Sequence, residues 1–237
     1  DDLDKARPYK MYVFLDAFHV TDAQKAAVRR LPSRGAKALV WVYAPGYVGA
    51  TLDVKGCYNL TGIKLKSYDD KSPLHVELSG NAAKFLPGAS AGSTYGTPMK
   101  IGPIIVGDDP TVEVLGSLYG VAEQGFVTKK IDGVQVYFSA APMLSSEVLR
   151  GIADRAGVHL YERGDDVLYV NRSFIGIHTA RPGKRTLHFP GAVNLYDVYN
   201  GAVVASGAKD VTLDLPVRHS ALYYMGTKEE WDALKRK

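Results

Sequence analysis

The chain has 237 residues, of which 46% are hydrophobic and 23% charged, enough for one large domain or two small ones with a sizeable core. The formal net charge is only +4 and the charges are scattered, so composition gives no argument for a nucleic-acid partner. No apolar run approaches the roughly 20 residues of a membrane helix, and no signal peptide is visible, so we expect a soluble protein without a membrane partner. The single cysteine excludes an internal disulfide but leaves the compartment, cytoplasmic or exported, open.

The N-terminal part of the chain alternates strand and helix. Residues 9–15 form a continuous apolar run, typical of a strand covered on both faces. Thr21 and Gln24 have the spacing of a capping box, for a helix that ends before Gly35. Residues 36–43 form a second apolar strand, and the short connections predict a parallel crossover, half of a doubly wound sheet. At least one earlier strand-helix unit would complete that sheet, and the chain does not begin with Met, so we interpret it as a piece of a longer protein.

The middle of the chain is predicted to hold one short helix and several strands. The helix is expected around residues 54–60. Residues 81–100 are rich in Gly, Ser, Ala and Pro and are predicted to form a long surface loop. Asp132 and Gly133 indicate a hairpin turn. Alternation predicts strands over residues 63–67, 74–78, 104–107, 112–118, 125–130 and 134–139.

A change of pattern at Gly157 divides the chain. Ser145 is predicted to cap a helix through Ala156, with Gly157 as its left-handed C-cap. Beyond it the hydrophobic period is two, and turn signals such as Pro190-Gly191 separate short strands, which predicts a β-sandwich. The predicted strands are residues 158–161, 167–170, 174–179, 185–189, 193–197, 201–205, 211–215 and 220–225. The predicted organisation is an α/β domain over 1–157, a β-sandwich over 158–226 and a charged helical tail over 227–237.

Two stretches resemble parts of a known family. The first reads YKMYVFLDAFHVTDAQKAAVRRLPSRGAKALVWVYAPGYV. It resembles the glutamine-amidotransferase-like domain of GH42-like, β-galactosidase-type glycoside hydrolases, which is called the trimerisation domain. The small β-domain that ends those enzymes is similar to the stretch LRGIADRAGVHLYERGDDVLYVNRSFIGIHTARPGKRTLHFPGAVNLYDVYNG. The resemblance covers most of the chain and is least clear over residues 81–100.

The resemblance implies an α/β fold, with a partial flavodoxin-like (class I amidotransferase-like) domain followed by a small antiparallel β-sandwich. It also implies a parent enzyme that acts on galactosides or related plant or algal sugars, with its catalytic carboxylates on an upstream barrel of the same polypeptide. The implied partners are that barrel, further copies in a homo-oligomer, by resemblance a trimer, and carbohydrate. We expect no cofactor.

One alternative makes the chain itself catalytic. Class I amidotransferases use a Cys on a tight strand-to-helix elbow with a His-x-Glu pair, and His75 and Glu77 have that spacing on one face of a predicted strand. The cysteine would be Cys57. A nucleophile elbow needs small residues on both sides, whereas Tyr58 and Asn59 follow Cys57. A buried core cysteine is the simpler interpretation.

Metal chemistry is not indicated. The histidines of the C-terminal half lie on different predicted strands without the spacing of paired ligands, and we expect no metal site. Two pairs of neighbouring aspartates lack a calcium-loop pattern and are expected to cap turns. These residues are His159, His178, His188, His219, Asp108, Asp109, Asp165 and Asp166.

The most promising surface follows from topology. In open α/β sheets, ligands bind outside the carboxyl ends of the strands. That edge carries Asp16, Phe18 and His19 after one strand and Tyr43 and Tyr47 after the next. Aromatic faces pack on sugar rings while carboxylates and imidazoles bind hydroxyls, so we predict a substrate contact here. Packing of the loops by Phe18 and Tyr47 is the alternative.

The sequence thus predicts a non-catalytic, C-terminal accessory region of a glycoside hydrolase that serves subunit assembly and shapes the active-site cleft. A stand-alone carbohydrate-binding module and an amidotransferase-like hydrolase using Cys57 are the alternatives. Exposed aromatic residues on the β-sandwich would favour the module. A Cys57 thiolate in a pocket beside His75 would favour the hydrolase.

Overall fold

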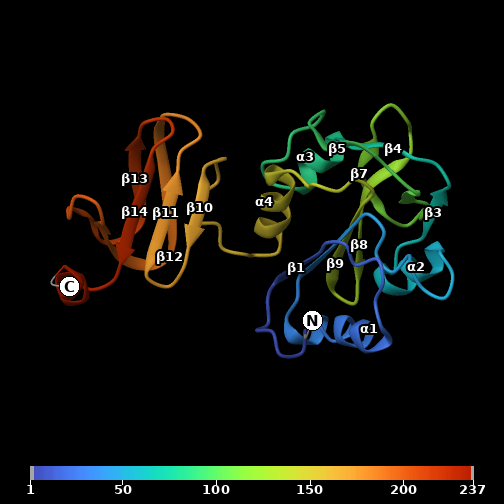
Figure 1. Ribbon diagram of the computed structural model, residues 1–237, viewed down its shortest axis with the longest axis horizontal. Coiled ribbons are helices and arrows are strands. Elements are labelled where there is room, and N and C mark those ends of the chain that lie inside the picture. The colour runs from blue at the N-terminus through green and yellow to red at the C-terminus, as the bar shows by residue number, and fades with distance from the viewer. Residues whose placement is uncertain (1–2, 236–237) are drawn as a thin grey trace. The chain divides into compact units, whose positions relative to one another are not determined.

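The computed structural model describes residues 3–235, which divide between Val158 and His159 into two compact units. Figure 1 colours the first unit from blue to yellow and the second from orange to red. Each unit has its own hydrophobic core. Among the described residues, no helix is both long and apolar enough to cross a membrane.

The first unit is built on a mixed sheet that begins with three parallel strands. These are β1 (Met11–Phe14), β2 (Ala38–Val42) and β9 (Val134–Ser139), in that order. The parallel pairing of β1 with β2 confirms the predicted strand-helix-strand unit. Every residue of β2 is buried, because this strand lies between two others and is covered on both faces.

The rest of this sheet is antiparallel. The predicted doubly wound parallel sheet is therefore present only as three parallel strands. The cause is local, since Asp132 (φ 48°) and Gly133 (φ 81°) form a two-residue turn that reverses the chain just before β9. The structure is therefore mixed α/β, and a flavodoxin-like arrangement stays a prediction. The antiparallel strands are β3 (Leu65–Tyr68), β4 (Ser72–Leu78), β5 (Thr94–Ile101), β6 (Ile104–Gly107), β7 (Glu113–Leu118) and β8 (Gln124–Ile131).

Three helices of the first unit lie close to where the sequence predicts them. Thr21 and Gln24 form the predicted capping box of α1 (Asp22–Arg29). Ser145 caps α4 (Ser146–Arg155), and Gly157, at φ 68°, ends it. The short predicted helix is α2 (Val54–Thr61), which Asp53 caps.

The long loop predicted over residues 81–100 is wrong. Ser79 caps a short helix, α3 (Gly80–Phe85), and β5 follows it and pairs with β4. Gly96 makes this pairing possible, because a Cβ at that position would lie 2.0 Å from the Leu74 carbonyl oxygen. The small residues that suggest a loop therefore permit a close backbone approach.

The strand predicted over residues 158–161 is also wrong. The Val158 amide donates to the Ala153 carbonyl and the Gly157 amide to the Asp154 carbonyl, which is the Schellman pattern at the end of α4. Residues 158–161 have no ladder partner among the residues that the structure describes.

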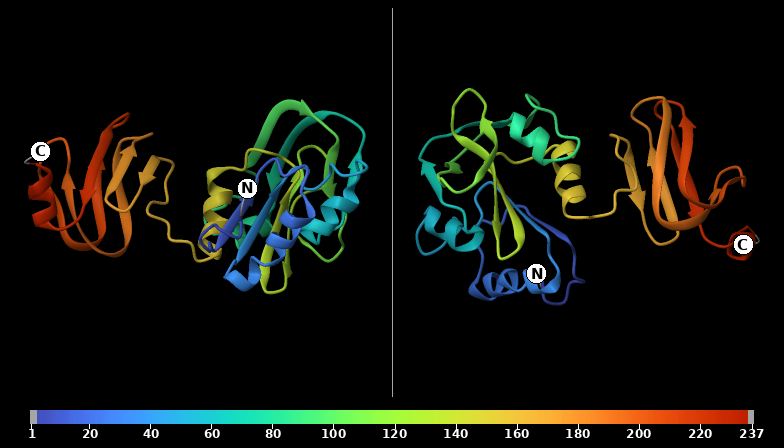
Figure 2. Two further views of the ribbon diagram at one scale, coloured as in Figure 1. Left: turned by 60° about the horizontal axis from the view of Figure 1, so that its bottom comes forward. Right: turned by 180° about the vertical axis from the view of Figure 1, so that it is seen from behind.

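The second unit is one antiparallel sheet, which corrects the expectation of two packed sheets. The strand order is β10-β11-β14-β12-β13, and the strands lie side by side in both views of Figure 2. β12 (Gly183–Asp197) joins all five strands into one sheet. Its first half pairs only with β13 (Val203–Leu215), and its last residues also pair with β14. The other strands are β10 (Val167–Val170), β11 (Phe174–His178) and β14 (Ser220–Met225).

The turn predicted at Pro190-Gly191 is a bulge inside the long strand β12. The register of β12 against β13 shifts between His188 and Val193, so Pro190 falls where no ladder hydrogen bond is needed. The predicted strands 185–189 and 193–197 therefore belong to β12. In the same way, most of residues 201–205 and all of 211–215 belong to β13.

A terminal helix, α5 (Lys228–Leu234), completes the second unit. Thr227 and Glu230 form its capping box. Trp231 is buried, with its ring stacked 5.2 Å from that of Tyr196 and 5.8 Å from that of Tyr224. The charged tail is therefore anchored to the sheet by an aromatic cluster.

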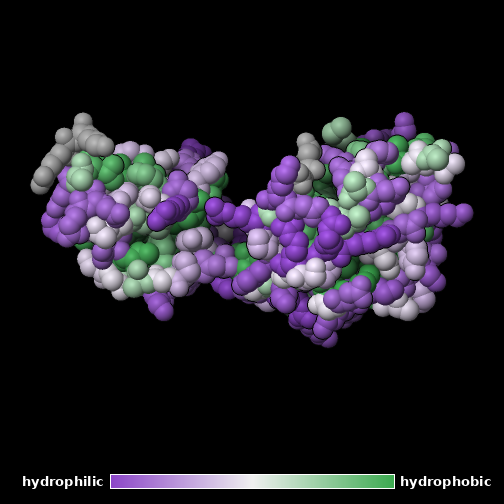
Figure 3. Space-filling model, turned by 90° about the horizontal axis from the view of Figure 1, so that it is seen from below, coloured by the Kyte–Doolittle hydropathy of each residue, from purple (hydrophilic) through white to green (hydrophobic). Residues whose placement is uncertain are grey.

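The surface shown in Figure 3 is mixed in polarity. Hydrophobic side chains appear there in small patches separated by hydrophilic ones. Patches of this kind are normal on a folded domain, because apolar atoms make up much of any protein surface.

Candidate functional site

The predicted site lies where β1 and β2 end. Asp16 (φ 53°) lies two residues after β1 and Tyr43 (φ 65°) comes directly after β2, and both have left-handed backbones. Residues other than glycine adopt this conformation rarely, at a cost on the order of 1–3 kcal/mol, and they cluster at sites where the surrounding structure fixes the chain. Because β1 and β2 are parallel, their carboxyl ends meet at one edge of the sheet.

Backbone hydrogen bonds join the two loops at this edge. The Gly46 amide donates to the Ala17 carbonyl at 2.7 Å, and the Val48 amide donates to the Phe18 carbonyl at 2.8 Å. Gly46 in turn lies against α2, where a Cβ added to Gly56 would be 2.0 Å from the Gly46 carbonyl oxygen. The loops are therefore held in one arrangement by each other and by α2.

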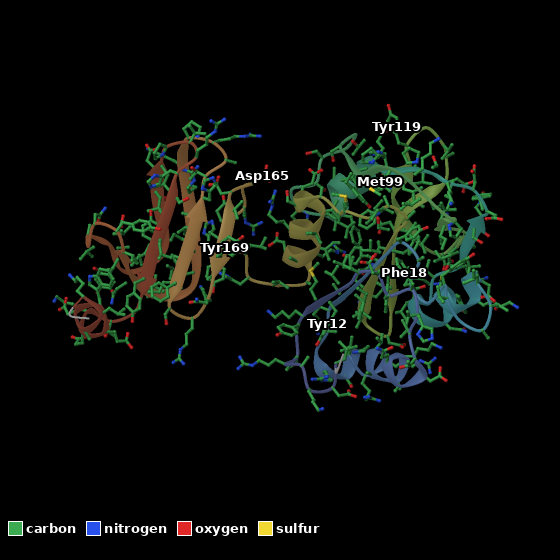
Figure 4. All side chains as sticks on the ribbon, in the orientation of Figure 1. Tyr12, Phe18, Met99, Tyr119, Asp165 and Tyr169 are labelled. Carbon is green, nitrogen blue, oxygen red and sulfur yellow. The ribbon has the colours of Figure 1, made fainter. Side chains whose placement is uncertain are left out.

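The aromatic residues of the predicted site pack these loops. Phe18 lies edge-on to Tyr43, with ring centroids 5.9 Å apart, and the Tyr43 hydroxyl donates to the Pro103 carbonyl at 2.9 Å. Burial, and the neighbouring Tyr47, raise the pKa of Tyr43. Phe18, Tyr43 and Tyr47 are all half-buried against the core, and Figure 4 labels Phe18.

The polar residues of the predicted site line a hollow beside α1. Asp16 and His19 are exposed and line a space of about 420 Å³, whose lining also includes the exposed Leu15 and the buried Trp41. Phe18, Tyr43 and Tyr47 do not line it. The structure thus brings together the five predicted residues at one edge but divides them into a packed aromatic group and an exposed polar pair.

Trp41 is the residue that sequence reasoning missed. It lines the hollow with only 1% of its surface exposed, and its Nε1 has no hydrogen-bond partner in the described residues. Its signal was the single tryptophan inside an otherwise aliphatic strand. This edge presents a carboxylate, an imidazole and apolar walls. Asp16 is the one carboxylate among the described residues that line the hollow.

The residues of the amidotransferase alternative lie in different environments. Cys57 is fully buried in α2, and burial raises the pKa of its thiol to about 12. His75 is half-buried and Glu77 exposed on β4, and both alternate with the buried residues Leu74, Val76 and Leu78. A thiol with such a pKa stays protonated at neutral pH, whereas the thiolate is the nucleophile. These are the properties of a core cysteine.

Native Cys57 is therefore expected to resist alkylation. Iodoacetamide at pH 7.5, an ordinary assay value, should leave the mass of the folded chain unchanged, because the thiol is buried and protonated. The same treatment in urea should add one carbamidomethyl group, which is the control. Rapid alkylation of the folded chain, read by intact mass, would contradict the burial and revive the amidotransferase alternative.

The neighbouring aspartates act as structural anchors. Asp109 is buried, accepts from the Thr111 amide and hydroxyl, and pairs with Lys129 at 3.0 Å. Burial alone would raise the pKa of its carboxyl, but the hydrogen bonds from Thr111 and Lys129 outweigh burial and hold that pKa far below its usual value. Asp166 accepts from the Ala180 amide and pairs with Arg185. The predicted turn-capping role is confirmed for Asp109, whereas Asp166 binds the distant residues Ala180 and Arg185.

Three histidines of the second unit each contact a different protein group. His178 Nδ1 lies 2.8 Å from the Ser220 hydroxyl, His188 Nδ1 lies 2.7 Å from an Asp210 carboxylate oxygen, and His159 Nε2 lies 2.8 Å from the His188 carbonyl. Within the described residues, no group of three or more potential ligands is arranged to hold a metal ion.

No known protein-family model and no curated protein sequence matches the chain, whereas solved structures do. The chain is similar over 95% of its length to 34% of a β-galactosidase from Bacillus circulans sp. alkalophilus, at a TM-score of 0.59 and 16% identity. Over 92% of its length it is similar to 32% of a catalytic mutant of Gan42B, a GH42 β-galactosidase from G. stearothermophilus, at a TM-score of 0.57 and 10% identity. It is also similar, over 92%, to 33% of a β-galactosidase from Rahnella sp. R3, at a TM-score of 0.56 and 11% identity.

The chain thus spans about a third of the length of these enzymes. At such low identity the likeness is one of fold. It runs through nearly the whole chain, and so includes both units. The protein therefore has the fold of a part of β-galactosidases, the GH42 enzyme Gan42B among them.

Proposed function

We propose that this chain is the C-terminal, non-catalytic accessory region of a GH42-like glycoside hydrolase, where it serves subunit assembly and shapes the active-site cleft. One observation carries the proposal: the fold matches 95% of this chain to only 34% of a β-galactosidase. A likeness confined to one part of an enzyme is what an accessory region would give. The partners would be an upstream catalytic barrel, further copies of the chain in a homo-oligomer, and carbohydrate.

The chemistry of the edge at Asp16 supports a role other than hydrolysis. Glycosidases of most families need two carboxyl groups, placed about 5–10 Å apart across the scissile bond. Asp16 is the one carboxylate among the described residues that line the hollow. Asp16 and His19 are exposed at a rigid edge, which suits a surface that completes the wall of a site on another domain.

A second candidate is a stand-alone carbohydrate-binding module. Two tyrosines of the second unit favour it, because Tyr169 is 75% exposed and Tyr199 is 71% exposed. Exposed aromatic rings are the surfaces on which sugar rings pack. The length of the natural polypeptide separates the two candidates.

The test is the size and activity of the native product. An antibody raised against this chain should capture, from the source organism, a polypeptide roughly three times as long, given the third of β-galactosidases that the chain matches. The captured protein should hydrolyse a chromogenic β-galactoside and sediment as an oligomer. A variant without these residues should sediment as a monomer.

Two results would overturn the proposal. A native product no longer than this chain would leave the carbohydrate-binding module as the better candidate. A long product that retains its full oligomeric mass and activity without these residues would exclude a role in assembly and in shaping the cleft.

A further inference from the structure

A second open cleft lies in the first unit and shares no lining residue with the hollow at Asp16. Its volume is about 990 Å³, within the range of small-molecule binding sites. Four segments line it: β3 with the turn after it, the start of β4, the first residue of β6, and the end of β7 with the turn before β8. Its lining combines tyrosine rings with carboxylates, a lysine and a histidine.

A fixed polar network joins β3 to the β7–β8 turn. Lys66 Nζ lies 3.0 Å from one carboxylate oxygen of Glu123, and the Tyr68 hydroxyl donates to the other at 2.7 Å. The hydrogen bonds from Tyr68 and Lys66 lower the pKa of Glu123. Glu123 therefore stays ionised at neutral pH and serves as a hydrogen-bond acceptor, not as a general acid.

The charge of the cleft excludes anionic ligands. Lys66 is engaged by Glu123, while Asp69 and Asp70 add two further carboxylates to the lining. A phosphate or a nucleic-acid backbone would meet net negative charge here. A neutral molecule whose hydroxyl groups donate to these carboxylates is compatible with this charge.

Two tyrosine rings present surface to this cleft. Tyr119 is 67% exposed and Tyr68 is 41% exposed. The backbone of Tyr119 is fixed although its ring is exposed, because its amide donates to the His75 carbonyl at 2.8 Å and the next residue, Gly120 (φ 81°), completes the turn. Figure 4 shows Tyr119 at the edge of the first unit. Because the backbone is fixed, a flat apolar surface that packs on the ring has to restrict only the side-chain torsions.

His75 supplies an uncommitted polar group. Its side chain is half-buried and lines the cleft, and no described residue hydrogen-bonds its imidazole. A neutral imidazole offers one donor and one acceptor, the pair that a sugar hydroxyl can satisfy. A role in ligand binding would therefore account for the position of His75 without an amidotransferase site that includes Glu77.

We propose that the cleft between β3 and the β7–β8 turn binds a neutral saccharide chain, with Tyr119 and Tyr68 against the sugar rings and His75 and Glu123 on the hydroxyls. This proposal concerns binding by the chain itself and does not depend on the proposed parent enzyme. The cleft is a binding site in this proposal, in which the ionised Glu123 accepts hydrogen bonds. It retains polysaccharide close to the enzyme or module to which the chain belongs.

Affinity electrophoresis of the purified 237-residue chain tests the proposal. Soluble β-1,4-galactan in a native gel should retard the chain, with soluble xylan and a hydroxyethyl cellulose as further probes. Tyr119→Ala should weaken the retardation about tenfold, as expected for the loss of one apolar ring face. This ring is exposed, so the variant should keep the thermal midpoint of the unaltered chain.

The matched control is Tyr9→Ala, which removes an exposed tyrosine of the first unit that does not line the cleft. It should leave retardation unchanged. Loss of binding in Tyr9→Ala but not in Tyr119→Ala would overturn the proposal and place the sugar site outside the cleft. Absence of retardation by all three polysaccharides would overturn it as well. Neither result bears on the length or the oligomeric state of the native product, so the two proposals fail separately.

Discussion

Replacing Trp41 with alanine is expected to lower the free energy of unfolding of the chain by about 3–5 kcal/mol. Trp41 is 1% exposed on the strand β2, and its ring stacks on that of Phe14 at a centroid distance of 4.0 Å and an interplanar angle of 12°. Alanine would leave a cavity between β2 and α1 that the rigid parallel strands cannot close. Urea unfolding followed by circular dichroism measures the change.

The conservative variant Trp41→Phe separates packing from hydrogen bonding. Its expected cost is below about 1.5 kcal/mol, because a ring still stacks on Phe14 and the indole Nε1 has no partner among residues 3–235 to lose. A cost for phenylalanine as large as that for alanine would mean that Nε1 has a bonding partner. A cost below about 1 kcal/mol for alanine would contradict the burial of the ring.

Replacing Asp166 with alanine is expected to destabilise the chain by about 3–5 kcal/mol. The side chains of Asp166 and Arg185 are only 9% and 7% exposed, and Arg185 Nε donates to Asp166 at 2.6 Å. The variant would leave a buried guanidinium whose remaining partners are carbonyl oxygens, those of Arg181 and Leu215 among them. It would also free the Ala180 amide, which Asp166 now binds.

A double-mutant cycle tests this argument. Arg185→Ala in the Asp166→Ala background should add little further loss, because the uncompensated charge is then removed. Asp165→Ala is the positional control, since this neighbouring carboxylate, labelled in Figure 4, is exposed, and its loss should cost less than about 1 kcal/mol. Two results would contradict a buried pair. One is that the losses of unfolding free energy in Asp166→Ala and Arg185→Ala add up in the double variant, and the other is that Asp165→Ala loses as much as Asp166→Ala.

The sequence predicted where the candidate site lies, but not which side chains line its hollow. Topology alone placed Asp16, His19 and Tyr43 at one edge, because parallel strands end together. The left-handed backbones of Asp16 and Tyr43 have no sequence signal, since loops formed far apart in the chain hold them. The cleft at Tyr119 was not predicted at all, because its walls come from segments about fifty residues apart that only sheet pairing brings together.

Local signals account for the elements that the sequence predicted well. The capping box of α1, the Ser145 cap of α4 and the Gly157 stop each depend on residues within one or two turns of helix. The strand β9 and the hairpin turn before it follow from alternation and from Asp132-Gly133. These features are short-range, so the amino-acid sequence by itself determines them.

Only the tertiary structure decided where neighbouring strands meet. Gly96 suggested a loop, yet it permits β5 to lie against the Leu74 carbonyl, and Pro190 suggested a turn, yet it sits in a bulge of β12. In both cases the same residue fits a turn and a close or irregular strand, and the partner strand selects between them. Strand order, the single sheet of the second unit and the cleft beside Tyr119 depend on contacts between distant segments, which local propensity does not encode.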